Sequence, residues 1–162
     1  MIQSLQQSVQ SVIADGRIGG PVFLRCMVQA HIEDAHIVKG MAALTALANM
    51  WMPSSPERLY ALGSADATQA TTTVQYAGGQ TAILSINRIP DPQVALNRPE
   101  SPKDLIGEAS VDLILIGNKG VIYHETPVGR HRLMNAPLEF SGGEHLMGLM
   151  EQAMKTGKPV NL

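Results

Sequence analysis

The sequence predicts an α+β fold: a mainly antiparallel β-sheet with helices packed on one face and the other face open for association. Along the chain the pattern is helix, strand, helix, then several strands with hairpin connections, then a last helix. Strands and helices that are segregated in this way are typical of α+β domains. With 162 residues, 44% apolar and 16% charged, the chain is expected to form one domain over residues 1–162 with a single core.

The first two elements are an amphipathic helix and a strand. Apolar residues recur at three- and four-residue spacing over 2–15, and Gly16 ends this helix. The following strand, over 22–31, alternates so that Cys26 lies on the apolar face and Arg25 on the other. A thiol on an apolar strand face is usually inert packing.

A second helix is predicted over 39–52. Its residues are apolar nearly all the way round, and Pro53 stops it. A helix of this kind is buried on most sides, by its own domain or by a partner. A further strand over 57–64 follows and leads into a hairpin.

The hairpin over 71–88 is the clearest strand signal in the chain. Two β-prone runs flank Gly78-Gly79, which is a signal for a tight turn. In its second run Ala82, Leu84 and Ile86 alternate with polar residues, so one face is expected to be dry. A slip of one residue in the pairing would exchange the two faces, and the sequence leaves that register open.

The remaining elements are a loop, a second hairpin and a helix. Residues 89–103 contain four prolines and are expected to form a long loop or an arm. The second hairpin joins 111–116 to 121–125. Ser141 and Glu144 have the spacing of a capping box at the start of the last helix.

Composition and charge exclude several classes of partner. The net charge of −2 and the scarcity of aromatic residues disfavour binding to nucleic acid and to anionic membranes. No apolar stretch is long enough to span a bilayer, and the N-terminus lacks the pattern of a signal peptide. The single cysteine suits a reducing compartment, so we expect a soluble cytoplasmic protein.

The densest cluster of ligand-type side chains is His31, Glu33 and His36. Imidazole and carboxylate groups at such spacing can hold zinc, iron or another divalent ion. The alternative is a solvated loop in which Asp34 caps the next helix. Arg25, on the preceding strand, would complete a metal- or histidine-dependent site.

Three further residues are candidates for ligand binding. Arg130 and His131 belong to a small basic cluster that could hold a carboxylate or phosphate, and an exposed loop is the alternative. His124 lies at the end of a strand. His31 or His124 could also serve as the axial ligand of a haem on the open sheet, although nothing in the spacing demands a haem.

Five segments, in order along the chain, resemble the C-terminal domain of the Gfo/Idh/MocA oxidoreductase family. They are Val12 to Val22, with its helix-Gly-x-Ile-Gly-strand pattern, Trp51 to Ala61, Ala77 to Ala82, Ile114 to Gly120, with its Gly-x-Lys-Gly turn, and Met154 to Val160. Each segment is weak alone, but the five occur in family order and are spread over nearly the whole chain, from residue 12 to residue 160. In the family the sheet commonly serves as an oligomer interface, and helices of this domain help to wall the substrate cleft.

The resemblance also implies which functions this chain lacks. The family's nucleotide-binding (Rossmann) domain, with its Gly-rich loop and catalytic lysine, has no counterpart here, so we expect no NAD(P) site. The family's Asp-x-Gly-x-His-x-x-Asp motif precedes Trp51, where its three ionisable positions fall near Gly40, Leu44 and Leu47. None of these residues can move a proton.

Three functions stay open. The first is an NAD-independent ligand-binding or accessory domain, for a small polar or sugar-like molecule, that forms homo-oligomers through its open sheet, because large apolar patches are rarely left bare. The second is a metal- or histidine-dependent enzyme built around His31, Glu33 and His36. The third is the small subunit of a split oxidoreductase that a separately encoded Rossmann chain completes.

Overall fold

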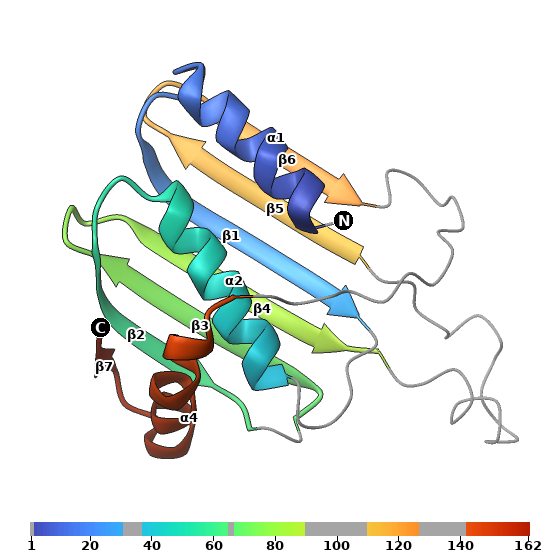
Figure 1. The fold of residues 1–162 in the computed structure, drawn as a ribbon, viewed down its shortest axis with the longest axis vertical. Coiled ribbons are helices and arrows are strands. Elements are labelled where there is room, and N and C mark those ends of the chain that lie inside the picture. The colour runs from blue at the N-terminus through green and yellow to red at the C-terminus, as the bar shows by residue number, and fades with distance from the viewer. Residues whose placement is uncertain (1, 31–36, 65–66, 90–109, 127–141) are drawn as a thin grey trace, which may run out of the picture.

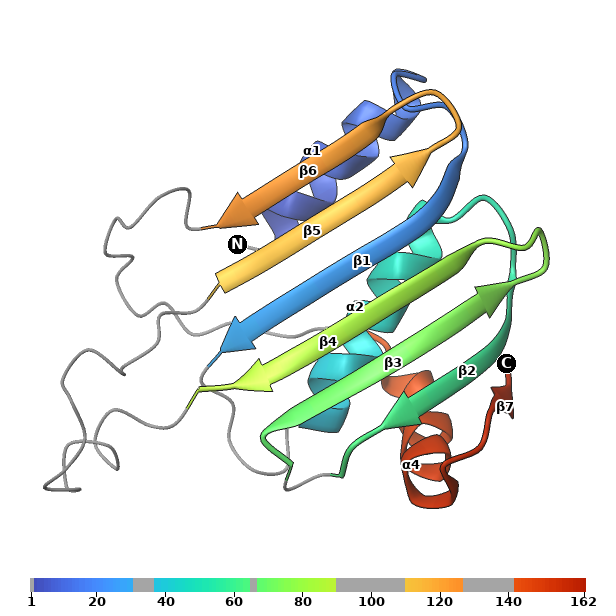
Figure 2. The same cartoon turned by 180° about the vertical axis from the view of Figure 1, so that it is seen from behind.

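A computed structural model describes residues 2–30, 37–64, 67–89, 110–126 and 142–162 of the chain. A seven-stranded sheet carries the described helices on one face (Figure 1), and the view from behind shows strands with no described helix over them (Figure 2). The predicted α+β class is therefore confirmed. No helix in these ranges is long and apolar enough to cross a membrane.

The elements follow in the predicted order, and their bounds differ from the predicted ones by a few residues. Along the chain they are α1 (Ile2–Ala14), β1 (Pro21–Ala30), α2 (Ile37–Trp51), β2 (Pro56–Leu62), β3 (Gln69–Tyr76), β4 (Thr81–Arg88), β5 (Ser110–Gly117), β6 (Val121–Thr126), the 3₁₀ turn η3 (Glu144–Leu146), α4 (Met147–Thr156) and β7 (Val160–Asn161). The short strand β7, which pairs with β2, was not predicted. The loop predicted after residue 89 lies outside the described residues.

The strand order is β6-β5-β1-β4-β3-β2-β7. β1 and β4 run parallel, and every other neighbouring pair is antiparallel. Parallel neighbours require a crossover connection. The chain between them contains α2, which packs against β3 and β4 on the covered face (Figure 1).

The register of the first hairpin places Gln75 opposite Thr81 and Thr72 opposite Leu84. Ala82, Leu84 and Ile86 are then all buried beneath the helices, as the alternation predicted. The turn closes with a hydrogen bond from the Gly79 amide to the carbonyl of Tyr76 at 2.9 Å. This register decides which side chains of β3 and β4 reach the uncovered face.

The core lies between the sheet and the helices. α2 is buried on almost every side, as its apolar sequence predicted. The fully buried residues of the sheet are inward-pointing residues of β1, β4 and β5, which include Leu24, Val28, Leu84, Ile86, Leu113 and Leu115. Burying an aliphatic side chain of this size contributes about 1.5–3 kcal/mol, so this layer holds most of the stabilising apolar contact.

Two of the segments that resemble the oxidoreductase family meet at one corner of the fold. The turn after β5 packs on the loop before β1. The backbone amide of Asn118 donates a hydrogen bond to the Gly20 carbonyl at 3.0 Å. The Asn118 Oδ1 atom accepts the Gly20 amide at 3.1 Å, and the Lys119 amide donates to the Ile18 carbonyl at 2.9 Å. These backbone amides are used within the fold, so the glycine-rich corner is architectural.

A second pair of these segments also meets in space. The Ser54 hydroxyl donates to Gln80 Oε1 at 2.6 Å and accepts the Gly78 amide at 3.2 Å. The Ala77 amide donates to the Ser55 carbonyl at 3.0 Å. The segment after α2 therefore anchors the β3–β4 turn, which gives both sequence patterns a structural role.

The start of the last helix differs from the prediction. The turn η3 precedes α4, and its N-cap is Gly143, with φ of 79° and no side-chain cap. Glu144 is the first residue of that turn, whereas the predicted capping box makes it the third residue after an N-cap at Ser141. The predicted N-cap is therefore wrong. Ser141 itself lies outside the described residues. Gly143 approaches the carbonyl of Ala42 so closely that a side chain would overlap it.

Candidate functional site: the open face of the sheet

The candidate site is the sheet face that no described helix covers, and we call it the open face (Figure 2). Side chains alternate between the two faces of a strand, so the register of the ladders assigns each residue to one of them. The open face consists of Val121, Tyr123, Glu125, Ser110, Asp112, Ile114, Ile116, Phe23, Arg25, Met27, Gln29, Thr81, Ile83, Ser85, Asn87, Gln69, Thr71, Thr73, Gln75, Arg58, Tyr60 and Leu62.

A continuous row of side chains crosses the middle of this face. Arg25 stands at its centre, directly between Ile83 on β4 and Ile114 on β5. The row continues from Ile83 to Thr73 and Tyr60, and from Ile114 to Tyr123. The row therefore sets an arginine among β-branched and aromatic side chains, and arginine and tyrosine are both enriched in protein interfaces.

The edges of the open face carry its most exposed apolar groups. Tyr123 is 62% exposed and Val121 is 58% exposed on β6, and Leu62 is 51% exposed on β2. Single exposed apolar residues are ordinary on protein surfaces. Tyr123 belongs to the central row, and Val121 and Leu62 lie two residues from Tyr123 and Tyr60 on the same strands, so these exposed groups border the row.

The acidic groups of the open face lie on β5 and β6. Asp112 is paired directly with Glu125 across the two strands, and like charges in this arrangement are destabilising. The Tyr123 hydroxyl donates to Glu125 Oε2 at 3.2 Å. That hydrogen bond, together with the carboxylate's charge, raises the pKa of the Tyr123 phenol.

Hydroxyl and amide groups gather toward one end of the open face. Ser110 Oγ donates to Gln29 Oε1 at 3.3 Å, and the hydroxyls of Thr71 and Ser85 share a hydrogen bond of 3.0 Å. Asn87 lies directly opposite Gln29 on the neighbouring strand. These groups supply donors and acceptors for a polar molecule, and they are not proton-transfer groups at neutral pH.

Two of the predicted site residues lie in the described part of the chain, and they lie on opposite faces. Arg25 points to the open face, whereas His124 is paired with Leu113 on the helix-covered side, where α1 lies over β5 and β6 (Figure 1). The structure therefore does not bring His124 to the face where an axial haem ligand was expected. No group of three or more metal-ligating side chains occurs among the described residues.

The other candidates, His31, Glu33, His36, Arg130 and His131, all lie outside the described residues. The proposed metal site and basic cluster therefore stay predictions.

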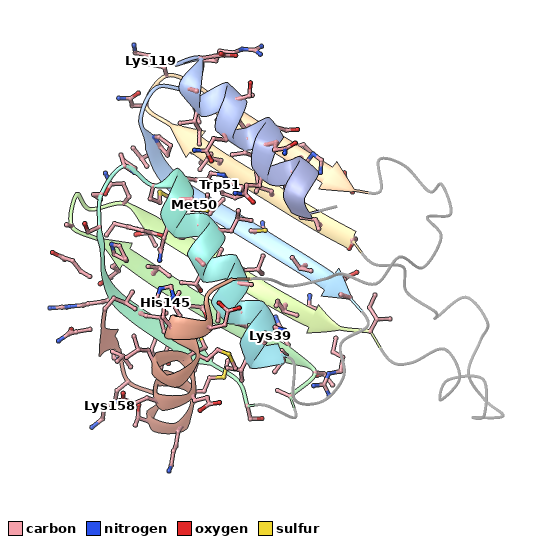
Figure 3. The ribbon with its side chains drawn as sticks, in the orientation of Figure 1. Lys39, Met50, Trp51, Lys119, His145 and Lys158 are labelled. Atoms are coloured by element: carbon pink, nitrogen blue, oxygen red, sulfur yellow. The ribbon has the colours of Figure 1, made fainter. Side chains whose placement is uncertain are left out.

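Helix α2 occupies the place that the resemblance assigns to the family's catalytic motif. Gly40, Leu44 and Leu47 are all buried on it. Thr45 is buried too, and its hydroxyl donates to the Met41 carbonyl at 2.9 Å, one turn earlier. The only ionisable side chain of this helix is the exposed Lys39 at its N-terminal end (Figure 3).

Cys26 is packed in the core and is chemically protected. Its side chain is 2% exposed, and burial, with a smaller contribution from the negative charge of Asp112, raises its pKa from 9.0 to about 12. The reactive form of a thiol is the thiolate. We therefore expect a thiol reagent at pH 8 to leave Cys26 untouched in the folded protein and to titrate one thiol after unfolding in denaturant. Rapid reaction in the folded state would contradict this placement.

The same shift predicts a loss of stability in alkali. The pKa of Cys26 is higher in the folded chain than in the unfolded chain, so its contribution is complete below about pH 9 and falls as the pH rises toward 12. Three pKa units correspond to roughly 4 kcal/mol. Burial also raises the pKa of Tyr76, which acts in the same direction. Urea unfolding at pH 8 and pH 10.5 should show the loss, and Cys26→Ala should lose less than the unchanged chain.

Sequence reasoning did not place Asp112, Glu125 and Tyr123 on the same face as Arg25. The alternation of Asp112 with buried Val111 and Leu113 was the available signal, because it places the carboxylate on the outer face of its strand. β5 lies beside β1, although β1 follows α1 early in the chain. This neighbourhood depends on the topology of the whole sheet, so local sequence patterns do not predict it.

The sequence matches no family model, and a search of curated proteins found no match. Solved structures share the fold. A myo-inositol dehydrogenase from Corynebacterium glutamicum aligns with a TM-score of 0.66 at 12% identity, over 97% of this chain and 61% of that one. The apo scyllo-inositol dehydrogenase from Lactobacillus casei aligns with a TM-score of 0.62 at 13% identity, over 96% and 60%. The same enzyme with bound NAD(H) and scyllo-inositol gives 0.56 at 11% identity.

These neighbours are dehydrogenases of the Gfo/Idh/MocA type, and this chain spans about 60% of the length of each of the two. At such low identity the match concerns the fold. It confirms the resemblance that the five sequence segments indicated. The chain therefore has the fold of a part of the Gfo/Idh/MocA-type inositol dehydrogenases, consistent with their C-terminal domain.

Proposed function

We propose that this chain is an NAD(P)-independent ligand-binding or accessory domain that self-associates through its open face. The observation that carries the proposal is the uncovered sheet face itself, with its central row of Tyr60, Thr73, Ile83, Arg25, Ile114 and Tyr123. The apolar and aromatic side chains of this row lose water favourably when another surface covers them. Self-association through the open face supplies such a surface.

The proposal assigns no acid–base chemistry to α2. The positions that correspond to the family's ionisable residues hold Gly40, Leu44 and Leu47, which are buried and cannot exchange protons. General acid–base catalysis needs a titratable group within reach of the substrate. The domain is thus proposed to bind or to support binding, and not to oxidise.

The ligand that we propose is a small polar, polyol-like molecule. Two of the neighbouring structures are inositol dehydrogenases, and one of them contains scyllo-inositol. The chain's single cysteine, buried in the core, fits a cytoplasmic setting as part of the same proposal.

The test is a pair of substitutions on the open face. Ile83→Lys with Tyr123→Lys places two charges in the central row, which should convert a dimer or larger assembly into single chains. Native mass spectrometry reads the assembly mass and any retained small molecule together. Circular dichroism checks that the variant is folded.

Met50→Lys is the matched control. Met50 is 53% exposed and belongs to α2, on the helix side of the sheet (Figure 3). Its replacement also puts a charge in place of an exposed apolar group, but away from the open face. The assembly should persist in this variant. An assembly that survives the open-face variant but is lost in Met50→Lys would place the interface on the helix layer instead.

A further inference from the structure

We propose that the outer edge of β6 pairs antiparallel with the same edge of a second copy, so that the two sheets continue as one. This edge contact goes beyond the proposed function, because it joins the backbones of two strands and covers neither face of the sheet. In the register that we infer, Ile122 lies opposite Ile122 of the other copy. Val121 then lies opposite Tyr123, and the turn residue Lys119 lies opposite Glu125.

The two edges of the sheet are closed to different degrees. At one edge β7 pairs with β2 at Arg58 and Leu59, and the ladder from β2 to β3 shifts register after Pro56. Prolines, bulges and cover are means by which proteins keep an edge strand from pairing. At the other edge β6 is the outermost described strand (Figure 2), and its ladder to β5 runs without a shift from Val121 to Thr126. β6 also contains no proline, so this is the edge that can accept another strand.

The backbone of β6 directs hydrogen-bonding groups outward at Val121, Tyr123 and Glu125. The Gly117 amide donates to the Gly120 carbonyl at 2.8 Å, so the ladder from β5 to β6 begins with a hydrogen-bonded pair. Hydrogen-bonded and non-hydrogen-bonded pairs alternate along an antiparallel ladder. Every second residue from Val121 therefore turns its N–H and C=O groups away from β5. Outward groups of this kind are a template for an added strand.

Two of these residues also carry exposed side chains that match each other. Val121 and Tyr123 are both exposed on the open face, two positions apart on β6. With Ile122 on a two-fold axis, Val121 of each copy faces Tyr123 of the other, so the pair forms twice. Pairs of an aromatic and a β-branched side chain are among the stabilising cross-strand contacts of antiparallel sheets.

Charge selects this register over its neighbours. Lys119 lies in the turn before β6 and Glu125 lies near the end of the strand, and both are exposed. A strand rises about 3.4 Å per residue, so the two charges are about 20 Å apart and do not meet within one chain. An antiparallel copy brings Lys119 of each chain to Glu125 of the other, and opposite charges in this position are stabilising. A shift by two residues would instead place Val121 opposite Glu125 and remove both charge pairs.

A disulfide at the two-fold axis tests the contact and its register together. Ile122→Cys places two thiols opposite each other in a non-hydrogen-bonded pair, with Cα atoms about 4.5 Å apart, which suits a disulfide. Mild oxidation should give a cross-linked dimer in non-reducing electrophoresis. Tyr123→Cys, one residue further along β6, is the matched control. In this register it faces Val121 and should stay uncross-linked. Cys26 is buried and present in both variants.

Charge reversal is the second test. Lys119→Glu alone and Glu125→Lys alone should each raise the dissociation constant of the edge contact about tenfold. A one-to-one mixture of the two reversed chains should form heterodimers in preference to either homodimer. The chain with both reversals should pair again by itself. These measurements use native mass spectrometry on chains that also carry Ile83→Lys, which blocks the open face at a strand away from this edge.

The outcomes separate the edge contact from the open face. Tyr123 belongs to both, so Ile83→Lys alone is the variant that leaves the edge intact. If that variant is a single chain at every concentration, or if Tyr123→Cys cross-links and Ile122→Cys does not, the edge contact is overturned while self-association through the open face can stand. If Ile83→Lys leaves the whole assembly unchanged and Ile122→Cys cross-links, the edge contact stands and the proposed open-face association falls.

Discussion

Replacing Leu84 by alanine should lower the free energy of unfolding by about 2–5 kcal/mol. The side chain is 1% exposed and lies in β4 beneath the helices. Its truncation removes apolar contacts and leaves a cavity that the packed sheet and α2 can only partly fill. Urea unfolding at a fixed protein concentration measures the change.

Ile83→Ala is the matched control, one residue away on the same strand. Ile83 points to the open face and is half-buried in the single chain, so its truncation should cost the chain itself only about 1 kcal/mol. It should also weaken self-association, which appears as a stability that depends on protein concentration. An equal loss at both positions, independent of concentration, would contradict the assignment of the two faces.

Replacing Gly117 by alanine should destabilise the protein by about 1–3 kcal/mol. A Cβ atom at this position would overlap the backbone carbonyl of Ile18, in the corner where the turn after β5 packs on the loop before β1. The Cβ atom is fixed to the backbone of Gly117 and the carbonyl belongs to the backbone of Ile18, so neither can move aside as the end of a flexible side chain can. Thermal and urea unfolding, with the dichroism of the folded variant, measure the loss.

Gly20→Ala in the same corner is the control. An added Cβ at Gly20 meets no atom within 4 Å, and this glycine is not among those with positive φ. The change should stay within about 0.5 kcal/mol. A large loss at Gly20, or none at Gly117, would show that the corner is packed differently.

Much of the fold could be predicted from local sequence, because its strongest elements have clear periodicity. The apolar run of α2 predicted a helix buried on most sides, and the alternation around Leu84 predicted the dry face of β4. The start of α4 could not be predicted in this way. There Gly143 adopts a left-handed conformation against Ala42, a tertiary contact that overrides the local capping pattern.

The existence of an open face could be predicted, because the predicted helices cover only one face of the sheet. The residues that form the open face could not be predicted. Arg25 was recognised as an outward residue of its strand. Its neighbours Ile83 and Ile114 come from strands far along the chain, and their placement depends on the parallel pairing of β1 with β4 and the antiparallel pairing of β1 with β5. Strand order is a global property, so the presence of Asp112 and Glu125 on the same face as Arg25 became visible only in the assembled sheet.

Self-association is measured most directly by the mass of the unmodified protein in native mass spectrometry at micromolar concentration. The proposed self-association predicts a dimer or a larger assembly, because a second copy would cover the apolar side chains of the open face. A small molecule retained with that assembly would identify the ligand. A bare single chain across the whole concentration range would contradict the claim that this face is built for self-association.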